Sequence, residues 1–445
     1  MAEIKPFRGI RYAWEELSQQ EMGALVAPPY DVIGDAEQQR LYDRHRANIV
    51  RLDLNRIQKG DDGEDNRYER ARRHLFDWIA EGTVVVDRSP KLYAHEQEFE
   101  DETGTVYIRR GYVGLVKLAD YEEEVVLPHE RTLRGPKEDR LQLMKATECN
   151  LSQIFFLYDD EERQVDEVLF EQAEGGEEPA VSIETDDGIV HRLWPVGSEE
   201  AHRAVAEAME QRPLLIADGH HRYETALAYR NFRRDLADEV DPDAPYEYVM
   251  GFFVNMHDPG LQVFPTHRVV HSVQDFSMEA LIEQLESSPA FEVEPMAKQA
   301  CQEVEDCRKE LEGRAKKGPS FALVEAGGEA GVWVEYIGDG QEDFFPEDMP
   351  EEVRRLDVAI LHEGILEAQL NIDREAQREM THLRYAKSWS DGEEALHEGS
   401  TQLVAFMNPT RVEQVNEVCL SGGRMPQKST YFYPKILSGL AINPL

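Results

Sequence analysis

The sequence predicts a mixed α/β fold with α+β stretches, and three features of its apolar pattern indicate this class. Apolar residues recur along 92–99 and 106–118 as in strands, and the polar stretch 101–104 between them is typical of a hairpin turn. Residues 214–217 are all apolar and suit a buried strand, after which a helical pattern opens at Glu224. At 445 residues the chain is long enough for two or three domains.

In the first half of the chain, the pattern predicts helices between strands. Two prolines make 27–33 a rigid extended segment, and the apolar spacing along 68–79 predicts an amphipathic helix. The stretch 159–188 is acidic and has few large apolar residues apart from 165–170, so we expect an insertion on the surface rather than core. The other predicted elements are helices at 35–45 and 198–211 and strands at 49–54 and 84–86.

The second half repeats this mixture of elements. Residues 246–256 and 262–270 predict a pair of strands joined by the turn 257–260, and 338–350 resembles an acidic linker. Residues 404–415 predict a strand, a turn and a helix. The remaining predictions are helices at 278–286 and 297–313 and strands at 320–325 and 332–336.

The charge of the chain limits its partners. Asp and Glu number 89 against 48 Lys and Arg, which gives a net charge of −41. A field of this sign repels nucleic acid and anionic membranes, so neither is an expected partner. An acidic surface predicts a halophilic protein, although an acidic protein of ordinary habitat has the same composition. With no signal peptide and no long apolar run, we expect a cytoplasmic protein.

The segment from Asp218 to Arg222 reads Asp-Gly-His-His-Arg and joins the predicted strand to the predicted helix. A strand-to-helix turn directs unpaired backbone N–H groups and the positive end of the helix dipole at one point. Gly219 allows close approach of the backbone, and the histidines and the arginine add hydrogen-bond donors suited to phosphate oxygens. The turn therefore predicts an anion site.

Two further polar clusters lie far from this turn in sequence. One covers 127–132 and continues to Lys137, Asp139 and Arg140, and the other covers 425–431. Common alternatives lack support, because the chain has no G-x-G-x-x-G after a strand, no complete phosphate loop, no H-E-x-x-H and no G-x-S-x-G. The three clusters are thus the main candidates for chemistry.

In this order, the three clusters resemble those of the archaeal ADP-dependent free serine kinase, whose core is of the ParB/sulfiredoxin type. The matching segments are Pro128-His129-Glu130, the turn at 218–222 and 426–430. The whole chain also resembles a widespread, uncharacterised bacterial family of about the same length. Its hallmarks are Ile4-Lys-Pro-Phe7, Ala27-Pro-Pro-Tyr-Asp31, the DGHHRYETA stretch and Lys428-Ser-Thr-Tyr-Phe-Tyr-Pro434.

The kinase resemblance implies roles for these residues. Glu130 would be the catalytic base, and Asp218 would assist it or hold Mg²⁺. The nucleotide would be ADP or ATP, and the acceptor would be the hydroxyl of free L-serine or a similar small metabolite. Phosphate binding is implied for Gly219, His220, His221 and Arg222, and substrate binding for His129, Thr132, Lys428, Ser429 and Thr430.

The resemblance also suggests a domain division and leaves alternatives open. We expect an N-terminal α/β region at 1–125, a ParB/sulfiredoxin-like core at 126–240 with the insertion 159–188, and a C-terminal α/β region at 241–445. A ParB-like nucleotide switch or a scaffold without kinase activity is the alternative function. A sulfiredoxin-like reductase would need a cysteine in the turn, where histidines stand. For Tyr30-Asp31 and for 265–268 we favour purely structural roles.

Overall fold

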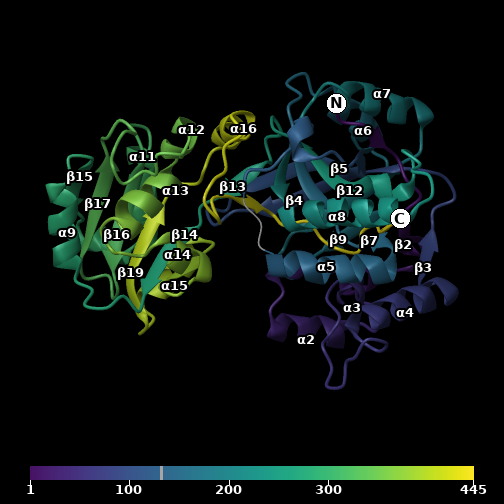
Figure 1. Cartoon of the computed structure of the whole chain (residues 1–445), viewed down its shortest axis with the longest axis horizontal. Coiled ribbons are helices and arrows are strands. Elements are labelled where there is room, and N and C mark those ends of the chain that lie inside the picture. The colour runs from purple at the N-terminus through teal and green to yellow at the C-terminus, as the bar shows by residue number, and fades with distance from the viewer. Residues whose placement is uncertain (131–133) are drawn as a thin grey trace. The chain divides into compact units, whose positions relative to one another are not determined.

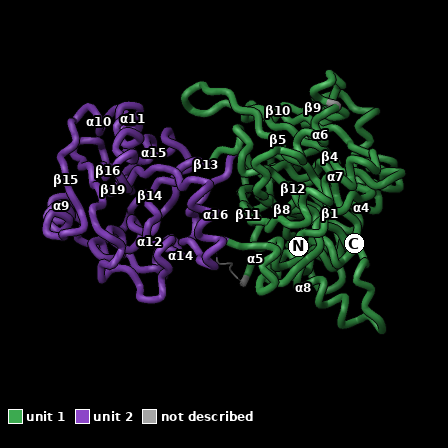
Figure 2. Tube along the Cα trace, turned by 90° about the horizontal axis from the view of Figure 1, so that it is seen from above, with its two compact units in different colours: residues 1–128, 132–262, 434–445 green, residues 129–131, 263–433 purple. Residues whose placement is uncertain are grey.

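A computed structural model describes residues 1–130 and 134–445 of the protein. The chain forms two compact units (Figure 2): the first comprises 1–128, 132–262 and 434–445, and the second 129–131 and 263–433. This division differs from the three consecutive regions suggested by the sequence, because strands of 1–125 and of 126–240 share one sheet and the C-terminal segment returns to the first unit. There the backbones of Ile442 and Ser438 form bridges with those of Ile10 and Ala27.

The first unit contains a large mixed sheet, which confirms the predicted mixed α/β class. The pairs β6–β11 and β8–β12 are parallel and the other neighbours are antiparallel. In spatial order the strands are β6 (Val126–Leu127), β11 (Leu214–Asp218), β8 (Ile154–Tyr158), β12 (Tyr248–Asn255), β5 (Val106–Lys117), β4 (Leu92–Glu100), β10 (Val190–Val196) and β9 (Val181–Glu184), and β1 (Ile4–Lys5) pairs with β5. Short pairs form between β2 (Ile10–Tyr12) and β3 (Val84–Val86) and between β7 (Cys149–Asn150) and β21 (Asn443–Pro444).

Helices cover this sheet, and α5 packs beside α8 (Figure 1). Tyr223 of α8 is fully buried and its hydroxyl donates to the carbonyl of Ala119 at 2.7 Å, which holds the start of α8 against the core. The helices are α1 (Gln19–Leu25), α2 (Asp35–Arg44), α3 (Val50–Asp53), α4 (Arg67–Ala80), α5 (Arg134–Thr147), α6 (Gln164–Glu174), α7 (Glu199–Met209) and α8 (His220–Leu236), with short 3-10 turns η1 (Trp14–Glu16), η2 (Tyr30–Val32), η3 (Tyr121–Glu123) and η4 (Pro245–Glu247).

The second unit is built on an antiparallel sheet. In spatial order its strands are β15 (Phe291–Pro295), β17 (Gly331–Tyr336), β16 (Ser320–Glu325), β19 (Thr401–Met407), β14 (His267–His271) and β18 (Leu383–Ala386), and β13 (Gln262–Phe264) pairs separately with β20 (Tyr431–Tyr433). Its helices are α9 (Met278–Ser287), α10 (Lys298–Gln302), α11 (Val304–Arg314), α12 (Glu351–Arg354), α13 (Asp357–Ala359), the π-helical η5 (Ile360–Glu367), α14 (Arg374–Glu379), α15 (Trp389–Leu396) and α16 (Val412–Leu420).

The predicted strand at 49–54 is wrong, because this segment forms the short helix α3. The Asn48 side chain accepts the N–H of Val50 at 2.9 Å and donates to the carbonyls of Ala24 and Val26. Val50 and Leu52 are fully buried. When the apolar residues of a short run are all buried, the spacing of apolar and polar positions does not distinguish a helix from a strand.

Two other expectations also need correction. Strands β12 and β14 belong to different units and do not form the predicted pair, since β12 pairs with β5 and β8 whereas β14 pairs with β18 and β19. The stretch 159–188 is not confined to the surface. Its strand β9 joins the large sheet, and its helix α6 buries Val165, Leu169 and Phe170 in the core. The helix directs only one side inward, which is enough to bury these few apolar residues.

No helix within 1–130 and 134–445 has both the length and the apolar character needed to cross a membrane.

Candidate functional site

The turn from Asp218 to Arg222 joins β11 to α8 in the first unit. Gly219 has a φ of +95°, in the left-handed region that favours glycine, and the helix begins at His220 rather than at the predicted Glu224. A Cβ on Gly219 would lie only 2.9 Å from Nε of Arg222. The glycine therefore allows both the turn and the close packing of the Arg222 guanidinium against the backbone.

Replacing Gly219 with alanine should lower the free energy of unfolding by about 1–3 kcal/mol, the range for a strained backbone conformation. Gly82→Ala is the matched control, because Gly82 has a φ of +75° but nothing within 4 Å of its added Cβ. Urea unfolding should therefore show a larger loss for Gly219→Ala than for Gly82→Ala. Equal losses would show that the guanidinium does not depend on this glycine.

Asp218 lies between two cations. Its Oδ2 accepts from Arg222 at 2.7 Å, and its Oδ1 accepts from Nζ of Lys435 at 2.9 Å. Burial by itself raises the pKa of Asp218, but the charges of Lys435 and Arg222 outweigh burial and hold this pKa well below its usual range. Asp218 is therefore ionised near neutral pH and ties the C-terminal segment to the turn.

This lowered pKa predicts how the stability depends on pH. A carboxyl with a lower pKa in the folded state stabilises the fold above its unfolded pKa and loses that contribution as the pH falls toward the folded value. Asp218→Asn should therefore reduce the free energy of unfolding by about 1.5–3 kcal/mol near neutral pH. The difference from the wild type should shrink below about pH 4. A difference that stays constant between pH 7 and pH 3 would contradict the pairing.

Lys435 is placed by buried groups on β4 and β5. Gln97 donates to the carbonyl of Lys435 at 3.3 Å, and Arg109 donates to the carbonyl of Pro434 at 2.6 Å and to the Gln97 side chain. Arg109 is fully buried, and burial lowers its pKa to about 9. These bonds fix the backbone from which Lys435 reaches Asp218.

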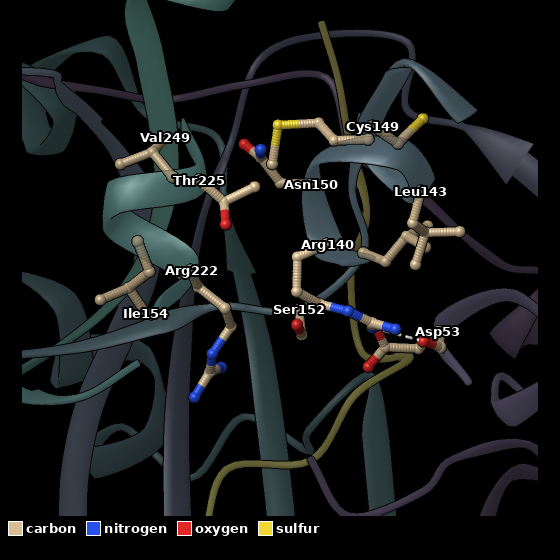
Figure 3. A pocket seen from close by; sticks show the side chains of 12 residues that line it. Asp53, Arg140, Leu143, Cys149, Asn150, Ser152, Ile154, Arg222, Thr225 and Val249 are labelled. Carbon is tan, nitrogen blue, oxygen red and sulfur yellow. Dashed lines mark hydrogen bonds and ion pairs between the residues drawn. The ribbon is translucent and has the colours of Figure 1, made fainter. Parts of the chain in front are cut away.

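A cavity lies beside the turn, and Figure 3 shows side chains from α5 and α8 that line it. Arg140 and Arg222 both line this cavity, and each is largely buried. Arg140 donates to the backbone carbonyl of Asp53 at 2.6 Å and lies 3.3 Å from its carboxylate, while Arg222 donates to the carbonyl of Gln153. The space, about 40 Å³, admits a few water molecules but no nucleotide base. The cavity is therefore too small for a large ligand, and the arginines that line it support the turn.

Tyr30 and Asp31 belong to the same electrostatic cluster. The ring of Tyr30 lies under the Arg140 guanidinium at 4.1 Å, and burial raises its pKa to about 12 against the opposing charges of Arg222 and Arg140. Asp31 in turn raises the pKa of Arg222, whose burial has the opposite effect. The Ala27-to-Asp31 motif, which we interpreted as a structural corner, thus also supports the charged residues of the turn.

The beginning of α8 is unusually positive. Its first turn contains His220, His221 and Arg222 and no acidic residue, and its N-cap residue, Gly219, has no side chain to cap it. Acidic residues normally favour this end of a helix, because the dipole is positive there. Lys435 adds a further cation beside Asp218. This arrangement suits a phosphate or a carboxylate.

The second unit brings together the other predicted residues. The backbone of Glu130 forms a parallel bridge with Met425, and the N–H of Met425 donates to the carbonyl of His129 at 2.7 Å. His129 is fully buried; its Nε2 lies 3.0 Å from the Thr430 hydroxyl and 3.9 Å from Oε1 of Glu130. Glu130, His129 and Thr430 thus form one connected polar cluster. Thr132 lies outside the described residues.

A buried arginine supports the loop at 426–430. Arg268 donates to the carbonyl of Lys428 at 3.0 Å and to Nε2 of His362 at 3.0 Å. Burial lowers the pKa of Arg268 to about 10, and the charge of Glu130 opposes that effect. His267 and Arg268 lie in β14 and pair with neighbouring strands, in agreement with ordinary strand packing. Arg268 also links the Lys428 loop to the surroundings of Glu130.

The side chains of this loop differ in exposure. Lys428 is exposed and has a φ of +57°, a left-handed conformation. Ser429 is buried, its hydroxyl donates to the carbonyl of Pro426 at 2.5 Å, and its own carbonyl accepts from Thr410 at 2.9 Å. The Ser429 hydroxyl therefore shapes the loop, whereas Lys428 presents its charge at the surface.

Mg²⁺ does not fit Asp218 in this structure, because both carboxylate oxygens are bonded to cationic side chains. Within the part of the chain that the structure describes, no group of three or more His, Cys, Asp or Glu side chains is arranged to hold a metal. We therefore assign no metal ligand to the turn.

Sequence reasoning missed Lys435, Arg109 and Arg268 as parts of these clusters. Lys435 directly follows the 428–434 hallmark, so its position next to a recognised motif was the available signal. Arg109 lies in a predicted strand among apolar residues, where an arginine is unusual and indicates a buried partner. For Arg268 the only signal was the polar Pro265-Thr-His-Arg268 segment.

The chain is similar to one protein family and to several solved structures. The sequence model of a family described as "Protein of unknown function (DUF1015)" matches residues 4–359. No curated protein matches the chain. Among solved structures, a free serine kinase variant in complex with ADP is 14% identical, with 71% of this chain and 89% of that chain covered and a TM-score of 0.35.

Two further solved structures are similar to the same extent. A conserved hypothetical protein from Pyrococcus furiosus is 15% identical, with 71% of this chain and 91% of that chain covered and a TM-score of 0.34. SbnI with a C-terminal truncation from Staphylococcus aureus is 10% identical, with 73% of this chain and 85% of that chain covered and a TM-score of 0.33. Similarity of this extent does not assign an activity to the chain.

Proposed function

The chain belongs to the DUF1015 family, and we propose that it is a phosphotransferase that moves a nucleotide phosphoryl group to the hydroxyl of a small metabolite, with free L-serine as the first candidate. One observation carries this proposal. Helix α8 starts directly after a left-handed glycine with a basic first turn, and Lys435 lies beside it. Backbone N–H groups and cations at a helix start are a general means of binding phosphate.

The second unit contains a polar cluster, His129, Glu130 and Thr430, with side chains of the kind that such a transfer needs. A hydroxyl nucleophile requires a group that accepts its proton, and Glu130 is a carboxylate whose side chain is 23% exposed. His129 lies 3.9 Å from this carboxylate and contacts Thr430. Lys428, in the same loop as Thr430, presents an exposed cation. The motifs that contain these residues resemble those of free serine kinase, which supports serine as the acceptor.

The test incubates the purified protein with ADP or ATP, Mg²⁺ and L-serine at low and high salt, and measures O-phosphoserine. Mg²⁺ is included because nucleotide phosphates commonly carry it. The proposal predicts product with at least one nucleotide. Nucleotide binding without product for any small hydroxyl compound would favour the alternative, a ParB-like switch or scaffold, and an absence of nucleotide binding would reject both.

A histidine variant checks the phosphate assignment. His221→Ala should weaken nucleotide binding by about ten- to a hundredfold, since a charge-assisted hydrogen bond contributes about 1.5–3 kcal/mol. His257→Ala is the matched control, because His257 is an exposed histidine of the same unit that pairs with Asp159. Isothermal titration of ADP into both variants should show the loss only for His221→Ala. Equal ADP affinities of the two variants would show that His221 does not bind the nucleotide.

A further inference from the structure

A second cavity in the first unit lies next to the turn and shares Lys435 with it. Its walls come from the end of α1, from one face of α2, from the β9–β10 turn and from the C-terminal segment. It offers about 180 Å³ of space, against about 40 Å³ for the cavity beside Arg222. Lys435 lines this larger cavity while its Nζ bonds Asp218 at 2.9 Å. The cavity is therefore adjacent to the proposed phosphate position.

The lining of this cavity combines apolar and polar side chains. Sites for small organic molecules, unlike sites for bare anions, combine apolar walls with polar groups that fix the orientation of the ligand. The polar residues are Glu37, Arg40, Arg44, Thr185, Asp186, Asp187, His191 and Lys435. Ala27 and Pro28 of the Ala27-to-Asp31 motif are part of the lining, which gives this motif a second role. The apolar residues are Val26, Ala27, Pro28, Leu41, Ile189 and Leu437.

The cavity extends from the surface to a buried histidine. Arg40 and Asp186 line it and are more than half exposed, and they form an ion pair with each other. His191 also lines it and is fully buried. Its Nδ1 lies 3.1 Å from Nε2 of His95, whereas its Nε2 has no hydrogen-bond partner among the described residues. A buried polar atom without a partner indicates a missing ligand atom or water.

His191 and Lys435 differ in charge, so they suit different parts of a ligand. Burial lowers the pKa of His191 to about 3, with a smaller effect from Arg109, so the ring is neutral near pH 7. A neutral imidazole nitrogen suits an uncharged donor or acceptor such as the edge of a heteroaromatic base. Lys435 lines the cavity and is bonded to Asp218 of the turn, so a negatively charged group would lie toward it.

We propose that this cavity binds the nucleoside part of a nucleotide, with the base between the apolar walls near His191 and the phosphates directed past Lys435 to the start of α8. The inference rests on the proposed function, because it places the other half of the same nucleotide. Both halves of this site lie in the first unit. The lining residues between Gly23 and Arg44 thereby acquire a role in ligand binding.

The test compares two ligands that differ by the nucleoside. ADP and inorganic pyrophosphate are titrated calorimetrically into the full-length protein and into Leu41→Trp and Leu437→Phe, which reduce the cavity from two different walls. The control is Leu236→Trp, because Leu236 is 68% exposed and does not line the cavity. Circular dichroism and urea unfolding confirm that each variant is folded, and either cavity variant alone is sufficient.

We expect ADP affinity to fall at least about tenfold in the cavity variants, the size of effect that a steric change in an apolar pocket produces. Pyrophosphate affinity should change less than about twofold, since its site at the turn is untouched. Unchanged ADP affinity in the folded variants would overturn the nucleoside site while leaving the phosphotransferase proposal intact. An absence of ADP binding by the wild-type protein would overturn both.

Discussion

Replacing Glu130 with glutamine should reduce the rate of phosphoryl transfer by about 10²–10⁴-fold, the usual contribution of a general base. Glutamine keeps the shape of the side chain but cannot accept the proton of the attacking hydroxyl. Because Glu130 is not assigned to nucleotide binding, the affinity for ADP should remain within about threefold of the wild-type value. Product formation and calorimetric titration on the same preparation measure both quantities.

The control for this prediction is Glu413→Gln. Glu413 is an exposed carboxylate in the first turn of α16, in the same unit as Glu130, and its replacement should leave the rate unchanged. If Glu130→Gln retains the wild-type rate, then Glu130 is not the base and the His129–Glu130–Thr430 cluster has a structural role. A loss of rate together with a loss of unfolding free energy would identify a folding defect.

Replacing Lys435 with methionine should weaken ADP binding by about ten- to a hundredfold, corresponding to the loss of a charge-assisted contact of about 1.5–3 kcal/mol. The effect has two causes. The ammonium group is removed from beside the helix start. Asp218 also loses one of the two cations bonded to it and keeps Arg222, so its negative charge is less fully balanced. Methionine preserves much of the apolar stem, so the packing against the cavity wall changes little.

Lys298→Met is the control for Lys435→Met. The Lys298–Glu329 pair is exposed on both sides, at 61% and 66%, so its loss should have little effect. Arg109→Met provides a further comparison, because it should displace Lys435 indirectly through the Pro434 carbonyl. Wild-type ADP affinity in Lys435→Met would contradict the assignment of the turn as the phosphate site.

Much of the fold could be predicted from local patterns. The helices α4 and α7 have clear periods, because each has one face in a core and one in solvent. The strands β4 and β5 are buried over much of their length, and the turn residues between them were the signal for the hairpin. Helix α3 could not be recognised in the same way, since its apolar residues are fully buried. The Asn48 side chain, which accepts the N–H of Val50, contacts the backbone where this helix begins. The pairing of β12 also could not be predicted, because its partners come from distant segments.

The candidate site was predictable where its residues are contiguous. The turn at 218–222 combines a strand end, a glycine and basic residues, and this local combination predicted an anion site. The partners of that turn were not predictable, because Lys435 meets Asp218 across 217 residues of sequence. Arg222 shows the same limit, since the sequence indicates a free phosphate donor whereas the folded chain buries it against Asp218 and Gln153. Local sequence predicts the type of site, whereas long-range packing determines which side chains remain available to bind a ligand.

The most direct test of the central claim is a crystal structure of the protein with ADP bound. The account predicts phosphate oxygens within hydrogen-bond distance of the backbone N–H groups at the start of α8, close to Nζ of Lys435. ADP bound elsewhere, with the turn at 218–222 free of phosphate, would contradict it.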